Sequence, residues 1–252
     1  MSEKAQPFTG HLTELRQRII VCLAALGLSL VPGWFASEPL QDFLQAPLNA
    51  ALPEGSQIVN LALTEAFANR MRVALIAALF FSLPVILYQI WRFAAPGLYA
   101  NERRYIAAFA LALTLLFFAG AAFGYMFVFP ATLLFFANFA PDEIPAYISQ
   151  ASYLSFAFWM FVAFGAVFET PLAIILLARF GIVDARRLGK QRKYALLLSF
   201  VAAALVTPSP DVFTQTMLAL PMYLLFEVGV IGARIIGKRR SSEETEARAG
   251  AA

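Results

Sequence analysis

The chain has 252 residues, of which 60% are hydrophobic and 14% charged, and its mean hydropathy is +0.70. A soluble domain is usually about 45–50% apolar and about 25% charged, so the composition excludes a soluble globular enzyme, a disordered chain and a disulfide-stapled secreted module. The single cysteine, Cys22, allows no intrachain disulfide and no multi-cysteine metal site. The net charge of +3 is small, and we interpret it as a membrane topology signal rather than a nucleic-acid footprint.

Six apolar segments are candidates for helices that cross a bilayer. A spanning helix needs about 20 mostly apolar residues, and backbone groups in lipid must form their hydrogen bonds within the segment. The predicted helices cover residues 19–36, 71–91, 105–129, 154–177, 194–206 and 212–231. We therefore expect an all-α integral membrane protein, a single domain over residues 1–240 in which kinked helices form a concave bundle.

Several shorter segments also have predictable structures. Residues 40–52 and 133–139 place apolar side chains at helical spacing, which predicts short helices that pack on the bundle or lie in the interface. The helix over 194–206 would reach only about 20 Å, so it must extend into its flanks, thin the bilayer or lean on neighbours. Residues 241–252 are small, charged and non-periodic, which predicts a disordered tail.

The positions of lysine and arginine predict the orientation of the helices. All of the 19 basic residues except Arg70 and Arg72 flank the same end of the six segments. Cytoplasmic loops of membrane proteins carry an excess of lysine and arginine. Both termini, including the tail, are therefore expected in the cytoplasm, which agrees with an even number of crossings.

The motifs of common enzyme classes are missing from the sequence. His11 is the only histidine, there is no G-x-S-x-G or H-E-x-x-H motif, and there is no Gly-rich phosphate-binding loop. We predict no catalytic residues, no metal site and no cofactor, so the chain is not expected to be an enzyme.

Glu169 is the charged residue that lies deepest within a predicted span, in the sequence Phe-Glu-Thr-Pro. A charge at that depth costs at least about 2.5–3.5 kcal/mol, so its carboxyl group should face protein or water. Pro171 cannot donate to the helix ladder, which predicts a kink or opening beside Glu169. One interpretation is a functional site, and the other is a neutral carboxyl bonded to a neighbouring helix.

Other polar residues of the spans have simpler structural interpretations. Gln89 and Gln215 are expected to form hydrogen bonds between helices. Glu227 can reach interfacial water or a cytoplasmic arginine, and Asp211 is a natural N-cap for the last helix.

Two acidic residues, Glu14 and Glu102, lie at the basic end of the spans. Locally, Glu14 can pair with Arg18 at i,i+4, and Glu102 can sit in the first turn of the third helix, where the dipole favours an anion. Two acids on an otherwise basic surface could also bind an arginine from another molecule.

Four ordered motifs run through most of the chain. They are His11-Leu-x-Glu14-Leu-Arg16-x-Arg18, the segment from Pro84 and Gln89 to Pro96-Gly-Leu98-Tyr99-x2-Glu102-Arg103, Phe164-Gly-x2-Phe168-Glu169-x-Pro171, and Thr207-Pro-x-Pro-Asp211-x2-Thr214-Gln215 followed by Pro221 and Glu227. In these motifs the chain closely resembles TatC, the polytopic subunit of the twin-arginine protein translocase.

The resemblance implies a function that composition does not. TatC-like proteins of the bacterial inner membrane bind twin-arginine signal peptides on the cytoplasmic side. With single-span TatA- and TatB-type partners, and in a receptor complex that contains several copies, they move folded proteins across the bilayer using the proton motive force.

The resemblance also assigns roles to individual positions. By position, Glu14 and Glu102 receive the arginine pair, while His11 and Arg16 frame the N-terminal helix. The residues that shape the loop before the third helix are Phe93, Pro96, Leu98, Tyr99 and Arg103. Glu169 lies in the concave membrane face, Pro47 supports assembly, and the region of Thr207, Asp211 and Gln215 docks a partner helix.

Guanidinium chemistry agrees with these roles, because a planar guanidinium matches a carboxylate with two hydrogen bonds and an ammonium does not. The alternative is a proton-coupled transporter of small solutes with Glu169 as its proton site. Such transporters usually contain an internal repeat and more intramembrane polar groups, and neither is visible in the sequence.

Overall fold

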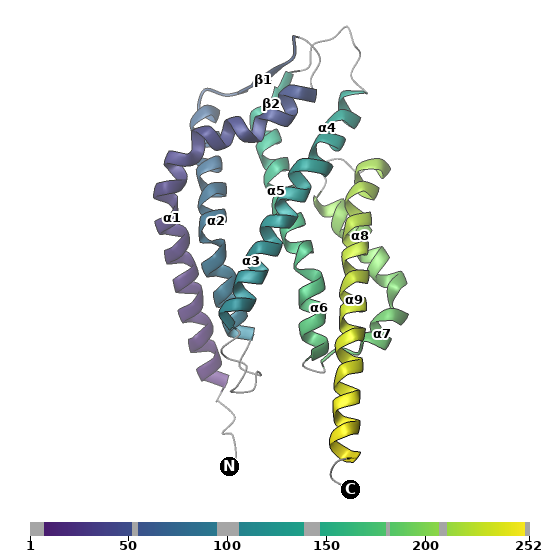
Figure 1. Ribbon diagram of the computed structural model, residues 1–252. Coiled ribbons are helices and arrows are strands. Elements are labelled where there is room, and N and C mark those ends of the chain that lie inside the picture. Colours follow the sequence, from purple (N-terminus) through teal and green to yellow (C-terminus); the bar gives the residue numbers. More distant parts are fainter. Residues whose placement is uncertain are drawn as a thin grey trace. The chain divides into compact units, whose positions relative to one another are not determined.

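The computed structural model describes residues 8–51, 55–94, 106–138, 147–179, 182–206 and 211–249, which are mostly helical (Figure 1). The elements are α1 (Phe8–Ala51), β1 (Gln57–Val59), α2 (Glu65–Ala94), α3 (Ile106–Phe123), the π-helix η3 (Gly124–Val128), α4 (Phe129–Ala137), β2 (Tyr147–Ser149), α5 (Gln150–Phe168), α6 (Thr170–Arg179), α7 (Ala185–Lys190), α8 (Arg192–Val206) and α9 (Val212–Ala249). Within these ranges, five helical stretches are long and apolar enough to cross a membrane. The prediction of a mostly helical membrane protein is confirmed.

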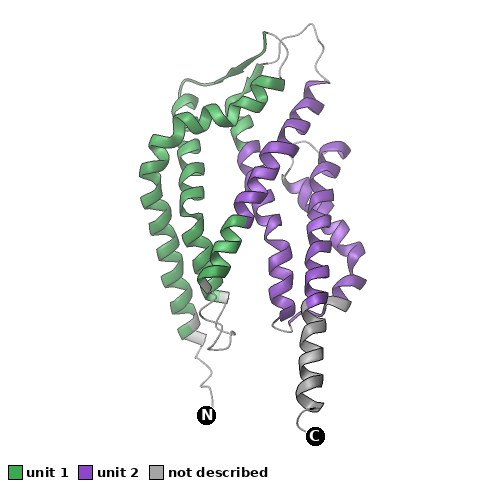
Figure 2. Ribbon diagram, viewed as in Figure 1, with its two compact units in different colours: residues 1–115, 140–155 green, residues 116–139, 156–252 purple. Residues whose placement is uncertain are grey.

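The chain groups into two compact units (Figure 2). Unit 1 contains Met1–Leu115 and Ala140–Ser155, and unit 2 contains Leu116–Phe139 and Phe156–Ala252. The expectation of a single domain over residues 1–240 stays a prediction.

Unit 1 is built on the packing of α1 against α2. A Cβ atom at Gly33 of α1 would lie 2.6 Å from the carbonyl oxygen of Ala74 and 3.1 Å from the amide nitrogen of Ala78, both on α2. Ala74 and Ala78 are buried as well. Small residues let the backbones of two membrane helices approach closely, so that van der Waals contact holds them together.

The first predicted helix, 19–36, and the separate short helix over 40–52 are one continuous helix in the structure. α1 runs from Phe8 to Ala51 and contains Pro32, Pro39 and Pro47. Each proline removes one backbone hydrogen bond and favours a bend, and Figure 1 shows α1 turning along its C-terminal part. The helix continues past Pro39 because it has buried side chains to pack there, Leu44 and Leu48.

The strands β1 and β2 are a correction to the all-α expectation. They pair in parallel, with Ile58 opposite Ile148. The residues that directly follow the two strands share a polar contact: the Asn69 amide donates to Asn60 Oδ1 at 2.8 Å and to Gln150 Oε1 at 3.4 Å. Strands of three residues are too short for a period-2 pattern, so the sequence did not predict them.

In unit 2, the third predicted helix does not end before Pro130. The π-helical turn η3 leads directly into α4, with Pro130 in its first turn, and α4 continues to Ala137. The amide of Phe129 donates to the carbonyl of Gly124, five residues back. This wider turn moves the backbone where a proline ring would otherwise clash with the preceding turn, so the predicted short helix over 133–139 is part of the same helical run.

The fourth predicted helix is interrupted at Glu169, which confirms the expected kink. α5 ends at Phe168 and α6 starts at Thr170. Glu169 N–H donates to the carbonyl of Ala166 at 3.2 Å, a tight turn rather than an α-helical bond. Pro171 has no N–H to continue the ladder across this point.

The last two predicted helices correspond to α8 and α9. α8 has 15 residues and is not among the five long apolar stretches. α9 extends to Ala249, and the disordered tail expected over residues 241–252 stays a prediction. Glutamates and alanines are good helix formers, and extending an existing helix carries no nucleation cost. Residues 250–252 lie outside the described part of the chain.

Candidate functional site

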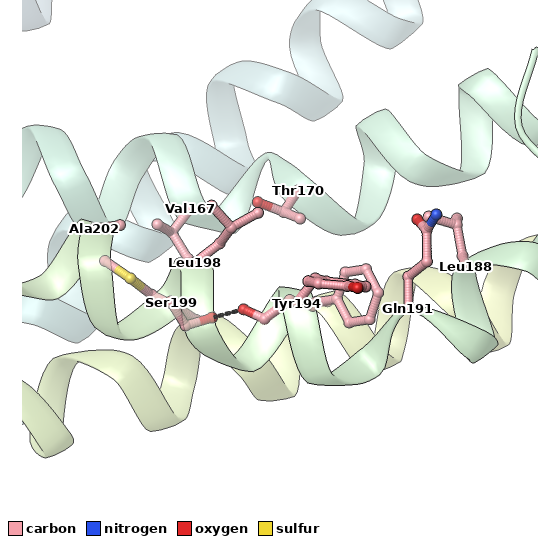
Figure 3. A pocket seen from close by; sticks show the side chains of 11 residues that line it. Val167, Thr170, Leu188, Gln191, Tyr194, Leu198, Ser199 and Ala202 are labelled. Atoms are coloured by element: carbon pink, nitrogen blue, oxygen red, sulfur yellow. Dashed lines mark hydrogen bonds between the residues drawn. The ribbon is translucent and has the colours of Figure 1, made fainter.

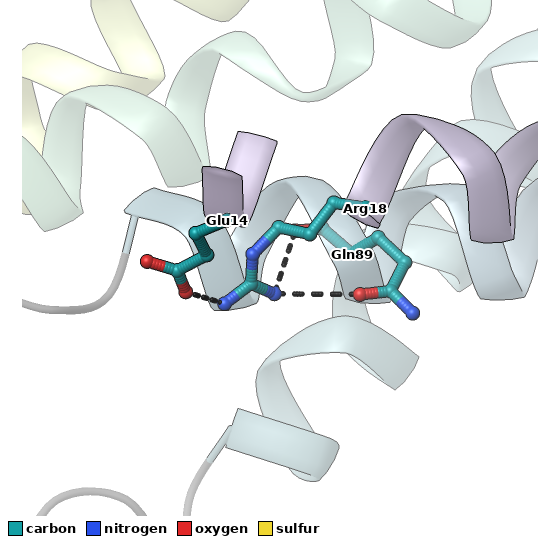
Figure 4. Close-up of polar contacts among 3 residues, drawn as sticks. All are labelled: Glu14, Arg18 and Gln89. Carbon is teal, nitrogen blue, oxygen red and sulfur yellow. Dashed lines mark hydrogen bonds and ion pairs between the residues drawn. The ribbon is translucent and has the colours of Figure 1, made fainter. Parts of the chain in front are cut away.

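Glu14, Arg18 and Gln89 form a polar cluster between α1 and α2 in unit 1 (Figure 4). The guanidinium of Arg18 donates to Glu14 Oε1, one turn earlier on α1. Its other terminal nitrogen donates to Gln89 Oε1 at 3.3 Å and to the Gln89 carbonyl at 3.5 Å. The predictions of an i,i+4 pair and of an interhelical hydrogen bond at Gln89 are both confirmed.

The two charged side chains of this cluster differ in exposure. The Arg18 side chain is 13% exposed and that of Glu14 is 32% exposed. Arg18 is therefore fixed against α2, whereas Glu14 reaches the surface. A carboxylate has two oxygens and about four lone-pair sites, so one carboxylate can accept more than one guanidinium.

The contact between Arg18 and Gln89 does not follow from the sequence. The sequence predicts Arg18 only as a local partner of Glu14 and Gln89 only as an interhelical donor or acceptor. Positions 18 and 89 are far apart in the chain, and a local spacing rule cannot join them. The available signal was that both lie at the basic ends of neighbouring predicted spans.

The other predicted members of this site are only partly described. Arg16 is exposed on α1, and Phe93 is half-buried near the end of α2. Pro96, Leu98, Tyr99, Glu102, Arg103 and Thr207 lie outside the described residues, as does the side chain of His11. Of the two acids predicted to bind arginine, Glu14 is the one that the structure describes.

Trp91 closes the core of unit 1 just before Phe93. Its side chain is buried, and its ring stacks on Phe109 with the ring centroids 5.2 Å apart and the planes at 26°. The contact joins the end of α2 to the start of α3, which flank the segment that contains Glu102. No local pattern in the sequence predicts this role of Trp91.

Glu169 has an unusual environment in unit 2. Both of its carboxyl oxygens are buried, and neither has a hydrogen-bond partner among the residues described. Among the described residues, Glu169 therefore lacks the predicted hydrogen bond to a neighbouring helix. The turn between α5 and α6 instead leaves a polar group enclosed within an apolar segment.

Further polar residues of unit 2 join α8 to α9 and cap the start of α9. Glu227 accepts two bonds from the Arg192 guanidinium, each 2.7 Å, and one from the Tyr223 hydroxyl at 2.9 Å. Gln215 donates to the carbonyl of Phe200 at 2.9 Å, and Asp211 caps α9 by accepting from the Thr214 amide at 2.7 Å. These contacts confirm the sequence interpretations of Glu227, Gln215 and Asp211.

Metal ligands do not gather in the described part of the chain. Over those residues, no group of three or more histidine, cysteine or acidic side chains could hold a metal ion. What the described clusters offer chemically is charge pairing and hydrogen bonding.

Comparison with known families agrees with this arrangement. The family model described as Sec-independent protein translocase protein (TatC) matches residues 10–221. The chain belongs to the TatC family. It is thus a multi-pass helical component of the Tat protein translocase, and the family is not a known enzyme family.

Individual TatC relatives match along almost their whole length. The chain is 43% identical over 244 residues to the Sec-independent protein translocase protein TatC of Escherichia coli strain K12, covering 96% of this chain and 94% of the relative. It is also 43% identical over 245 residues to the TatC protein of Desulforapulum autotrophicum, covering 97% and 90%. Such coverage gives no support to the alternative of a small-solute transporter.

A solved TatC structure has the same fold. The crystal structure of the twin arginine translocase receptor TatC matches with a TM-score of 0.80 and 33% sequence identity, covering 90% of this chain and 99% of that one. The helices of this chain are therefore arranged as in a TatC protein.

Proposed function

We propose that this chain is the receptor subunit that binds twin-arginine signal peptides through Glu14 and Glu102. The observation that carries the proposal is the Glu14–Arg18 pair. The Glu14 carboxylate already accepts a guanidinium in this fold, and the residue that supplies it is fixed to α2 through Gln89. A peptide arginine would bind the exposed side of the same carboxylate, and Glu102 would receive the second arginine.

The surrounding residues would shape the peptide site. His11 and Arg16 frame the N-terminal part of α1, and Phe93 supplies an apolar edge at the end of α2. The loop between α2 and α3, with Pro96, Leu98, Tyr99 and Arg103, would complete it. Each charge-assisted bond contributes about 1.5–3 kcal/mol, so two of them would separate paired arginines from a single one by more than tenfold.

The apolar stretch that follows the arginines would lie along the concave membrane face that contains Glu169. TatA- and TatB-type single-span partners would dock near Thr207, Asp211 and Gln215, and Pro47 of α1 would support assembly of several copies. The assembled complex would transport folded proteins using the proton motive force.

We also propose that the chain crosses the bacterial inner membrane six times as one domain, with α8 as the short crossing. Fifteen residues reach about 22 Å, so α8 would require local thinning of the bilayer. The distribution of lysine and arginine supports cytoplasmic positions for both termini.

An export assay tests the function. A folded reporter carrying an Arg-Arg leader is expected to be exported by cells whose only TatC protein is this chain, and the same reporter with a Lys-Lys leader is expected to be retained. The lysine leader keeps the charge but loses the planar two-bond geometry. Equal export of the two reporters would contradict recognition by carboxylate–guanidinium pairing.

A further inference from the structure

Unit 2 contains an open apolar cavity of about 340 Å³. Figure 3 shows its walls, which come from the α5–α6 region, from α7, from α8 and the turn before it, and from α9. The lining side chains include Val167, Leu188, Leu198, Ala202 and Met222. The hydroxyl of Ser199, also in the wall, donates to the Ala195 carbonyl of its own helix at 2.9 Å, so that hydroxyl does not require a polar ligand.

Two exposed lysines are next in the chain to residues of the cavity wall. Gln191 and Tyr194 line the cavity, and the exposed residues Lys190 and Lys193 are adjacent to them in the chain. The Lys193 ammonium lies 5.1 Å from the centre of the Tyr194 ring. Neither lysine forms an ion pair with any residue that the structure describes, whereas Arg192 is occupied by Glu227.

The combination points to an amphipathic anion, and we propose that the cavity binds one acyl chain of an anionic phospholipid whose phosphate pairs with Lys190 and Lys193. Basic pockets between membrane helices are suited to anionic headgroups, and each lysine near such a phosphate contributes roughly a fivefold gain in affinity. The apolar walls provide the site for the chain, in the size range of ordinary ligand pockets.

The charge beside the cavity argues for an anionic lipid rather than an apolar helix as its occupant. The Lys193 ammonium lies over the ring of Tyr194, which lines the cavity, so a headgroup phosphate would pair with it while the acyl chain follows the apolar wall. The proposal adds a lipid site to the translocase and is independent of the peptide site at Glu14.

Native mass spectrometry of the full chain in neutral detergent tests the proposal. Phosphatidylglycerol and phosphatidylcholine with identical acyl chains are titrated separately, and bound lipids are counted. We expect one phosphatidylglycerol to bind at least tenfold more tightly than phosphatidylcholine. Lys190→Gln and Lys193→Gln should each lower the phosphatidylglycerol affinity about fivefold, and Ala202→Phe, which fills the cavity, should abolish the site.

Two matched variants control for charge and for added bulk. Arg92→Gln removes an exposed cation from α2 in unit 1, and Ala204→Phe adds the same ring to an exposed position of α8. Neither should change lipid binding. Equal affinity for both lipids, competition by glycerol 3-phosphate as effective as by phosphatidylglycerol, or unchanged binding in Ala202→Phe would overturn the proposal. The proposal would also be overturned if an apolar helical peptide bound the wild-type chain but not Ala202→Phe, while lipid binding stayed the same.

Discussion

Replacing Glu14 with glutamine is expected to weaken binding of a twin-arginine peptide about ten- to one-hundredfold without preventing membrane insertion. The substitution keeps the shape of the side chain but removes the charge, so a charge-assisted bond of about 1.5–3 kcal/mol is lost. Arg18 keeps its bonds to Gln89, and the packing of α1 on α2 should survive. Crosslinking of a labelled signal peptide in membranes measures the effect.

Glu38 provides the matched control for this experiment. It lies on the same helix, its side chain is 76% exposed, and it forms only a long ion pair with Arg70 at 3.6 Å. Glu38→Gln removes the same charge from α1 and should leave peptide crosslinking at the wild-type level. If Glu14→Gln and Glu38→Gln behave alike, the Glu14 carboxylate is not a peptide site.

The largest effect on stability is expected for Gly120→Val in unit 2. A Cβ atom at Gly120 would meet the carbonyl oxygen of Phe164 and would lie 2.8 Å from two side-chain atoms of Phe168. Backbone and ring cannot both retreat, so the overpacking should lower the free energy of unfolding by about 3 kcal/mol. That loss corresponds to a fall in the thermal midpoint in detergent of about 6–12 °C.

Gly27→Val is the control for the change in backbone propensity. Nothing lies within 4 Å of a Cβ atom at Gly27, so the same substitution there should leave the midpoint unchanged or slightly higher. If Gly120→Val had the same thermal midpoint as the wild-type protein, the α3–α5 contact would be looser than described. The reciprocal contact, Phe117 against Gly165, predicts the same ranking for Gly165→Val.

Much of the helical architecture follows from local sequence features. Length and hydropathy predicted the long apolar helices, and the missing amide of Pro171 predicted the break at Glu169. The sequence misplaced the ends of helices at prolines, because Pro39 and Pro130 act differently from Pro171. Burial of Leu44 and Leu48 stabilises the part of α1 that follows Pro39. The π-helical turn accommodates Pro130. Both depend on packing between segments rather than on the proline itself.

The candidate site shows the same limit. The Glu14–Arg18 pair follows from a spacing of four residues, and the N-cap at Asp211 from its place before α9. The bond from Arg18 to Gln89 joins two helices, so no local spacing predicts it. For Glu227 the sequence predicted an arginine partner but did not identify Arg192. The lack of any partner for the Glu169 carboxyl among the described residues is a property of the folded interior that no local pattern carries.

The central claim is that Glu14 and Glu102 together bind the two arginines of one signal peptide. A double-mutant cycle tests it most directly: peptide affinity is measured for the wild-type chain, Glu14→Gln and Glu102→Gln, each with peptides in which either arginine is replaced by lysine. The account predicts that each acid couples to a different arginine by about 1.5–3 kcal/mol. Coupling below about 0.5 kcal/mol for every pair, the range of independent sites, would contradict it.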